Sequence, residues 1–136
     1  MPIRFLRTEG FRLSALYAGI LGLLVTALAI NVTVHRAKLK VDIGDGGNPQ
    51  MLRMIRVHAN AVEYVPLGLL LLGFYELDHG WPAALHAGGI ALIVGRVLHV
   101  AGVWNTAALN FGRAAGPTLT WITIAALAVL NLWQIR

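Results

Sequence analysis

The sequence predicts an all-α integral membrane protein, a bundle of four transmembrane helices that forms a single domain over residues 1–136. The chain is 57% hydrophobic and only 12% charged, whereas charged residues make up roughly 25% of a typical soluble domain. Its apolar runs are long enough to cross the hydrocarbon core of a bilayer, which is about 30 Å thick. The breaks between these runs are rich in Gly, Asn, Pro and charged residues, as connections usually are.

The first two helices are expected over residues 13–38 and 49–76. Residues 13–34 carry no charged side chain, and this run is too long for the apolar region of a signal peptide. The second helix is expected to begin at Asn48-Pro49, because Asn is a favoured N-cap and Pro suits the first helical position. These features predict two helices joined by a turn-rich connection.

The last two helices are expected over residues 82–103 and 114–135. Arg96 is the one Lys, Arg, Asp or Glu within the third helix, and the fourth contains none of these residues. Pro117 is expected in the first turn of the fourth helix, where a missing N–H costs least. Tryptophans lie near several predicted helix ends, as they do at membrane–water interfaces.

The basic residues predict an orientation and a class of partner. Most of the eleven lysines and arginines lie in or beside the connections between the first and second helices and between the third and fourth. The positive-inside rule therefore places these connections in the cytoplasm and both termini outside. The net charge of +5 accompanies apolar runs rather than a nucleic-acid-binding motif, so we expect anionic lipid or a small anion as the partner, and no nucleic acid.

A polar stripe is predicted on the second helix. Its members fall on one face about 100° wide: Arg53, Arg56, Asn60, Glu63 and Tyr64. A charge at the centre of a membrane helix costs about 2.5–3.5 kcal/mol. Arg96 and His99 share a similar face of the third helix. Pairing with Glu63 still leaves at least two of these arginines without a counter-charge, which favours an anionic partner from outside the chain.

The residues alone leave other interpretations open. Polar side chains in membrane helices often hydrogen-bond a neighbouring helix and fix the bundle, and basic residues near helix ends often bind lipid head groups. The stripe could therefore belong to a purely structural bundle, or to a non-catalytic membrane module that binds anionic lipid or a small anion. A metal site is not expected, because the chain has no Cys and its five His are scattered.

Four segments resemble the MAPEG proteins, the membrane-associated proteins in eicosanoid and glutathione metabolism. One of them is specific to the family: residues 53–66, RMIRVHANAVEYVP, resemble its second-helix signature. Residues 40–49, KVDIGDGGNP, look like the first connection of bacterial members, and residues 95–99, GRVLH, resemble the third-helix motif. Arg113, followed by Gly116, is similar to the entry of the fourth helix.

The resemblance implies a homotrimer of four-helix protomers in a bacterial inner membrane. Glutathione would bind as co-substrate between neighbouring protomers, near the cytoplasmic side. The implied function is that of a membrane-bound glutathione transferase, which joins the thiolate to hydrophobic electrophiles or lipids in the bilayer. Peroxidase activity towards lipid hydroperoxides is a further implied reaction.

The resemblance also assigns roles to residues. Arg113 would activate the thiol, and glutathione would be bound by Arg36, Arg53, Arg56, Asn60, Glu63, Tyr64, Arg96 and His99. The chemistry is consistent, because arginine forks bind carboxylates through charge-assisted bonds and a cation favours the ionised, nucleophilic thiol. Members with eicosanoid activity commonly carry Tyr where this chain has Val103, which argues against eicosanoid synthesis.

Overall fold

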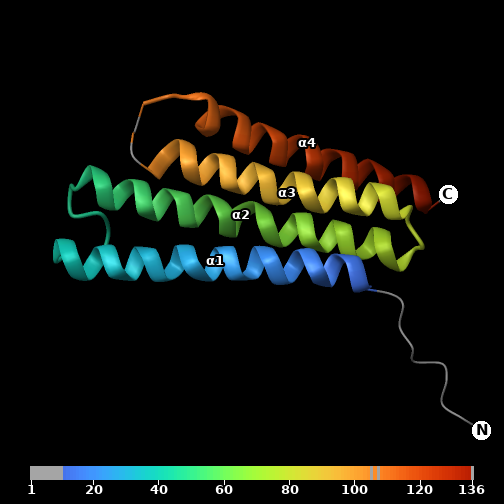
Figure 1. The fold of residues 1–136 in the computed structure, drawn as a ribbon, viewed down its shortest axis with the longest axis horizontal. Helices are drawn as coiled ribbons and strands as arrows, with labels where there is room; N and C mark the ends of the chain where they lie inside the picture. The colour runs from blue at the N-terminus through green and yellow to red at the C-terminus, as the bar shows by residue number, and fades with distance from the viewer. Residues whose placement is uncertain (1–10, 105, 107, 136) are drawn as a thin grey trace, which may run out of the picture.

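The computed structural model describes residues 11–104, 106 and 108–135. Its elements are α1 (Arg12–Leu39), α2 (Pro49–Leu77), α3 (Pro82–Trp104) and α4 (Phe111–Gln134). Successive helices run antiparallel (Figure 1), so the α1–α2 and α3–α4 connections share one end of the bundle and the α2–α3 connection lies at the other. The predicted all-α architecture of four helices is confirmed, and the described residues contain no strand.

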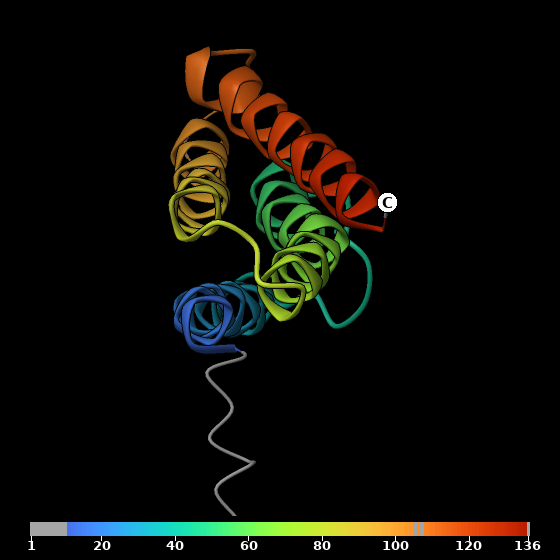
Figure 2. The ribbon, with the colours of Figure 1, turned by 90° about the vertical axis from the view of Figure 1, so that its right-hand side faces the viewer.

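The second and third helices hold the bundle together. Each of them packs against all the other helices, whereas the backbones of α1 and α4 do not approach each other within the described chain. Figure 2 shows this end-on, with the green α2 lying between α1, α3 and α4. Buried side chains follow α2 along its length in successive clusters, with Leu72 near one end, Val65 in the middle and Val57 near the other.

The outer surface of the bundle is apolar. Large hydrophobic side chains are exposed on every helix, including Leu23 on α1, Leu70 on α2, Ile90 on α3 and Leu132 on α4. All four helices are long and apolar enough to cross a membrane. Such a surface is suited to lipid, and the length and composition of the helices agree with the four predicted transmembrane spans.

Asparagine side chains begin two of the helices. The side chain of Asn48 accepts hydrogen bonds from Gln50 N at 2.9 Å and Met51 N at 3.1 Å, so the predicted start of α2 is confirmed. The start of α4 differs from the prediction at residue 114, because Asn110 caps a helix that begins at Phe111. Pro117 therefore lies beyond the first turn of α4, and its predicted place there is wrong.

Glycines bring the backbones of α3 and α4 into contact. A Cβ added at Gly102 would lie 2.2 Å from Arg113 N, and one added at Gly116 would lie 2.5 Å from His99 N. Small residues allow this close approach between membrane helices. The approach places His99 and its neighbours on α3 beside the first turns of α4, which is the arrangement on which the candidate site depends.

Candidate functional site

A cleft of about 270 Å³ opens at the end of the bundle that carries the α1–α2 and α3–α4 connections. Three helices contribute to it: the first turns of α2, the last turns of α3 and the first turn of α4. Its lining residues are Pro49, Leu52, Arg53, Arg56, Asn60, His99, Val103 and Arg113. Five of the nine predicted site residues therefore meet in one cleft, although they come from segments far apart in the sequence.

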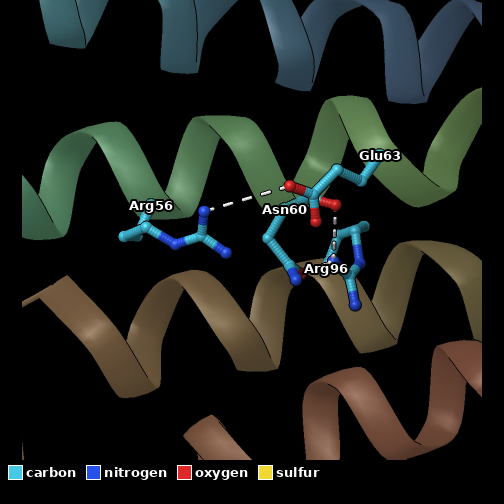
Figure 3. A network of polar contacts seen from close by, with 4 residues as sticks. All are labelled: Arg56, Asn60, Glu63 and Arg96. Carbon is cyan, nitrogen blue, oxygen red and sulfur yellow. Dashed lines mark hydrogen bonds and ion pairs between the residues drawn. The ribbon is translucent and has the colours of Figure 1, made fainter.

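The arginines on α2 form one wall. Arg53 and Arg56 lie one turn apart, and the Nε atom of Arg53 is buried without a hydrogen-bond partner among the described residues. Nη1 of Arg56 lies 3.9 Å from Oε1 of Glu63, as Figure 3 shows, and these side chains are 58% and 48% exposed. An exposed pair at this distance is weak, so Arg56 keeps most of its capacity to bind another anion.

His99 and Arg113 form the opposite wall. His99 is only 9% exposed, and its Nδ1 atom has no hydrogen-bond partner in the described part of the chain. Arg113 is the third residue of α4, where its backbone N–H donates to Oδ1 of Asn110 at 3.0 Å. The positive end of the α4 dipole points towards this region, so Arg113 and the helix terminus both favour a negative group in the cleft.

Arg96 lies behind the cleft rather than in its lining. Its side chain is 1% exposed, and it donates to the side-chain oxygen of Asn60 on α2. On α4 it donates to Thr120 Oγ1 at 2.6 Å and to the Gly116 carbonyl at 3.4 Å. Its guanidinium carbon also lies 5.9 Å from the centre of the Tyr64 ring. Arg96 thus joins three helices and makes no contact with the space of the cleft.

Three further predicted ligands lie outside the cleft lining. Glu63 lies beside Arg56. Nη1 of Arg36 donates to the carbonyl oxygens of Val41, Asp42 and Gly44, the shortest bond being 2.9 Å to Gly44. Arg36 therefore holds the α1–α2 connection against the end of α1. Tyr64 packs edge-on against Trp121, with ring centres 6.2 Å apart.

Sequence reasoning missed the apolar part of the lining and the anchor of Arg96. Pro49, Leu52 and Val103 give the cleft an apolar wall. Val103 had one signal, the Tyr that other members commonly carry at its position, whereas nothing in the sequence marked Leu52 as a lining residue. Thr120 had a weak signal, since it follows Gly116 by four residues and so lies on the face of α4 that packs against α3.

The charge of the cleft is one-sided. Within the described part of the chain, its lining includes three arginines and no carboxylate, and Glu63, outside the lining, pairs with Arg56. Charged side chains are costly within a membrane span, and they often mark sites of function. Among the described residues, no three His, Cys, Asp or Glu side chains are grouped as metal ligands. The arrangement is suited to a small molecule that carries carboxylates.

Fold and cleft together define a multi-pass membrane protein with a cationic cleft between its helices at one end of the bundle. The chain belongs to the MAPEG family, whose sequence model matches residues 14–133. It is 35% identical over 120 residues to the inner membrane protein YecN of Escherichia coli K12. The aligned region covers 88% of this chain and 90% of that protein. YecN of Escherichia coli O6:H1 matches to the same extent. The predicted family and the integral inner-membrane location are confirmed.

Proposed function

We propose that the protein is a membrane-bound glutathione transferase whose site is the cationic cleft. The observation that carries this proposal is the convergence of Arg53, Arg56 and Arg113 on a cleft whose lining has no carboxylate. Glutathione offers two carboxylates, an ammonium group and a thiol. Its carboxylates match the arginine forks, and the family to which the chain belongs includes glutathione transferases.

The geometry suggests a division of roles along the cleft. Arg53 and Arg56 are suited to hold the carboxylates, and Glu63 beside Arg56 is suited to the ammonium group. Arg113 at the N-terminal end of α4 would stabilise the thiolate, whose proton is released to water. The sulfur then forms a bond to an electrophilic carbon while the leaving group departs with its electron pair. Leu52 and Val103 provide an apolar wall for a hydrophobic electrophile.

The proposed assembly is a homotrimer, with the α1–α2 and α3–α4 connections in the cytoplasm. Its support is that the side chains of Arg56 and Glu63 are half-exposed on a helix that spans the membrane. Lipid tails cannot solvate these charges, so a neighbouring protomer would cover them. Arg36 lies at the same end of the bundle, and we assign it to the cleft of a neighbouring protomer. Native mass spectrometry in a mild detergent tests this, because a monomer alone would contradict the assembly.

The test of function begins with binding. Calorimetry of the detergent-purified protein is expected to show saturable binding of glutathione and of S-methyl glutathione. An activated aryl chloride should then be conjugated to glutathione faster than in protein-free detergent, and a lipid hydroperoxide assay tests the second reaction. Binding without turnover would contradict the transferase. Binding of neither compound, together with binding to vesicles rich in phosphatidylglycerol, would favour a module that recognises anionic lipid.

A further inference from the structure

The amide group of Asn60 lies between the buried Arg96 and the cleft. Nη1 of Arg96 donates to the side-chain oxygen of Asn60 and approaches its backbone oxygen at 3.5 Å, and Figure 3 shows the side-chain contact across α2 and α3. A guanidinium has donors and no acceptor, so only the amide oxygen can face Arg96. The NH₂ group of Asn60 is then directed away from Arg96, on a residue that lines the cleft.

The position of Arg96 is fixed from the other side. Its Nη2 donates to Thr120 Oγ1 at 2.6 Å and to the Gly116 carbonyl at 3.4 Å, and Thr120 Oγ1 itself donates to the same carbonyl at 3.0 Å. The side chain is 1% exposed. Because α4 holds its far nitrogen, Arg96 cannot turn towards the cleft without losing these bonds. Among the described residues that line the cleft, Asn60 is the one to which Arg96 is hydrogen-bonded.

The cleft side of Asn60 is left with unused donors. The described residues provide no hydrogen-bond acceptor for its NH₂ group, while Arg56 and Arg53, about one and two turns away on α2, present further donors. If Arg96 were absent, the amide could turn over and offer its oxygen to the cleft at little cost. The orientation of this one amide thus decides whether the wall offers only donors or a mixture of donors and acceptors.

We propose that Arg96 is a positioning residue that locks the Asn60 amide with its NH₂ group towards the cleft, so that this wall selects ligands that present carboxylate oxygens. The identity of the ligand as glutathione rests on the proposed function above. The selection itself applies to any carboxylate-bearing ligand. Arg96 is thereby separated from the residues that touch the ligand, although its mutation would weaken binding.

Asn60→Asp is the main test, because the two side chains have nearly the same shape. The new carboxylate can pair with Arg96, so the variant should fold with a thermal midpoint at or above that of the wild type. Its affinity for S-methyl glutathione should fall at least about tenfold, which corresponds to about 1.4 kcal/mol. The preference for the free acid over the diethyl ester should fall as well. Unchanged affinity and preference would overturn the proposal, because Asn60 would then only bridge the helices.

Two variants separate positioning from packing. Arg96→Met leaves Asn60 in place but removes the lock, so the free-acid preference should fall although every residue of the lining is retained. The control Thr123→Val removes a buried hydroxyl of the same helix, whose hydrogen bond to the Leu119 carbonyl at 2.7 Å stays within α4, and it should leave affinity within about twofold of the wild type. A loss of affinity and preference in Thr123→Val as large as in Asn60→Asp would contradict the proposal. If Arg96→Met does not fold, the other two variants decide it.

A second ligand keeps this inference distinct from the proposed function. Wild-type protein that binds no glutathione would refute the transferase. The affinities of the same variants for citrate and for its trimethyl ester would then be compared, in place of those for S-methyl glutathione and its diethyl ester. A wild-type preference for citrate that falls in Asn60→Asp would support the inference alone. Wild-type protein that binds neither carboxylate ligand would overturn both.

Discussion

The two ends of the bundle use polar side chains in opposite ways. At the end with the α2–α3 connection, the carboxylate of Glu76 accepts hydrogen bonds from Leu13 N at 2.8 Å and Ser14 N at 2.7 Å, and so caps α1 from another helix. The hydroxyl of Tyr17 lies 2.7 Å from Nδ1 of His86. At the cleft end, cations converge instead, and the buried Nε of Arg53 and Nδ1 of His99 have no hydrogen-bond partner among the described residues.

This difference separates structure from function more clearly than residue type does. A polar group in a membrane helix is costly unless it is paired. Pairing within the chain, as at Glu76, stabilises the bundle and leaves nothing for a ligand to bind. At the cleft end, the Nε atom of Arg53 has no hydrogen-bond partner among the described residues, and the pair of Arg56 with Glu63 is long and exposed, so positive charge stays available to a ligand. The comparison therefore predicts that mutations at one end change stability and that mutations at the other change binding or turnover.

The largest expected effect is on turnover, in Arg113→Ala. Loss of the cation beside the sulfur should reduce the thiolate fraction and lower kcat with an activated aryl chloride by about 100-fold, or about 2.7 kcal/mol. The thiolate absorbance of bound glutathione should fall in parallel. Arg113→Lys keeps the charge and should retain more activity than Arg113→Ala. Unchanged turnover and absorbance in Arg113→Ala would exclude Arg113 from thiol activation.

Removal of the α1 cap should affect stability alone. Glu76→Ala leaves two N–H groups and the Ser14 hydroxyl without their acceptor, so the free energy of unfolding should fall by about 2 kcal/mol. Glu76→Gln retains one acceptor oxygen, so its free energy of unfolding should lie between those of the wild type and Glu76→Ala. Thermal unfolding in mild detergent measures this effect. A loss of glutathione affinity in folded Glu76→Ala would break the distinction between the two ends.

The reverse pattern is expected for Arg53→Gln. This change removes a half-buried cation from the cleft, so the Kd for S-methyl glutathione should rise about tenfold, or about 1.4 kcal/mol. Stability should stay constant or rise, because an unpaired charge is removed from the membrane. The matched control is Arg12→Gln, which removes the same charge from an exposed position at the other end. An equal loss of affinity in the control would mean that Arg53 acts through the net charge of the protein and not through contact with the ligand.

Sequence patterns predicted all four helices, and every helix end except the start of α4 to within one residue. Long uncharged runs define membrane helices because lipid tolerates little else, and Asn48-Pro49 marked the start of α2 through local capping chemistry. The start of α4 was placed too late because the apolar run begins after Arg113, whereas the helix begins as soon as Asn110 supplies an acceptor. A polar first turn costs little at the membrane boundary, so hydropathy does not detect it.

The site was predicted in part for a related reason. A helical wheel gives the face of α2 but no depth, so Arg53, Asn60 and Tyr64 shared one predicted stripe although Tyr64 does not line the cleft. The burial of Arg96 depends on the close approach of α3 and α4 at Gly116. That approach is a tertiary feature, and no spacing within α3 reveals it.

The smallest expected effect tests the opposite end again. The side-chain nitrogen of Asn131 donates to the Leu71 carbonyl on α2 at 2.9 Å and to the Leu127 carbonyl in its own helix at 2.8 Å. Interhelical hydrogen bonds in membrane proteins average about 0.6 kcal/mol, and the Leu127 carbonyl also has its helical partner. Asn131→Leu should therefore lower stability by about 0.6 kcal/mol and leave glutathione affinity unchanged. A destabilisation several times larger would mean that this bond, and not burial around Leu72, holds α4 against α2.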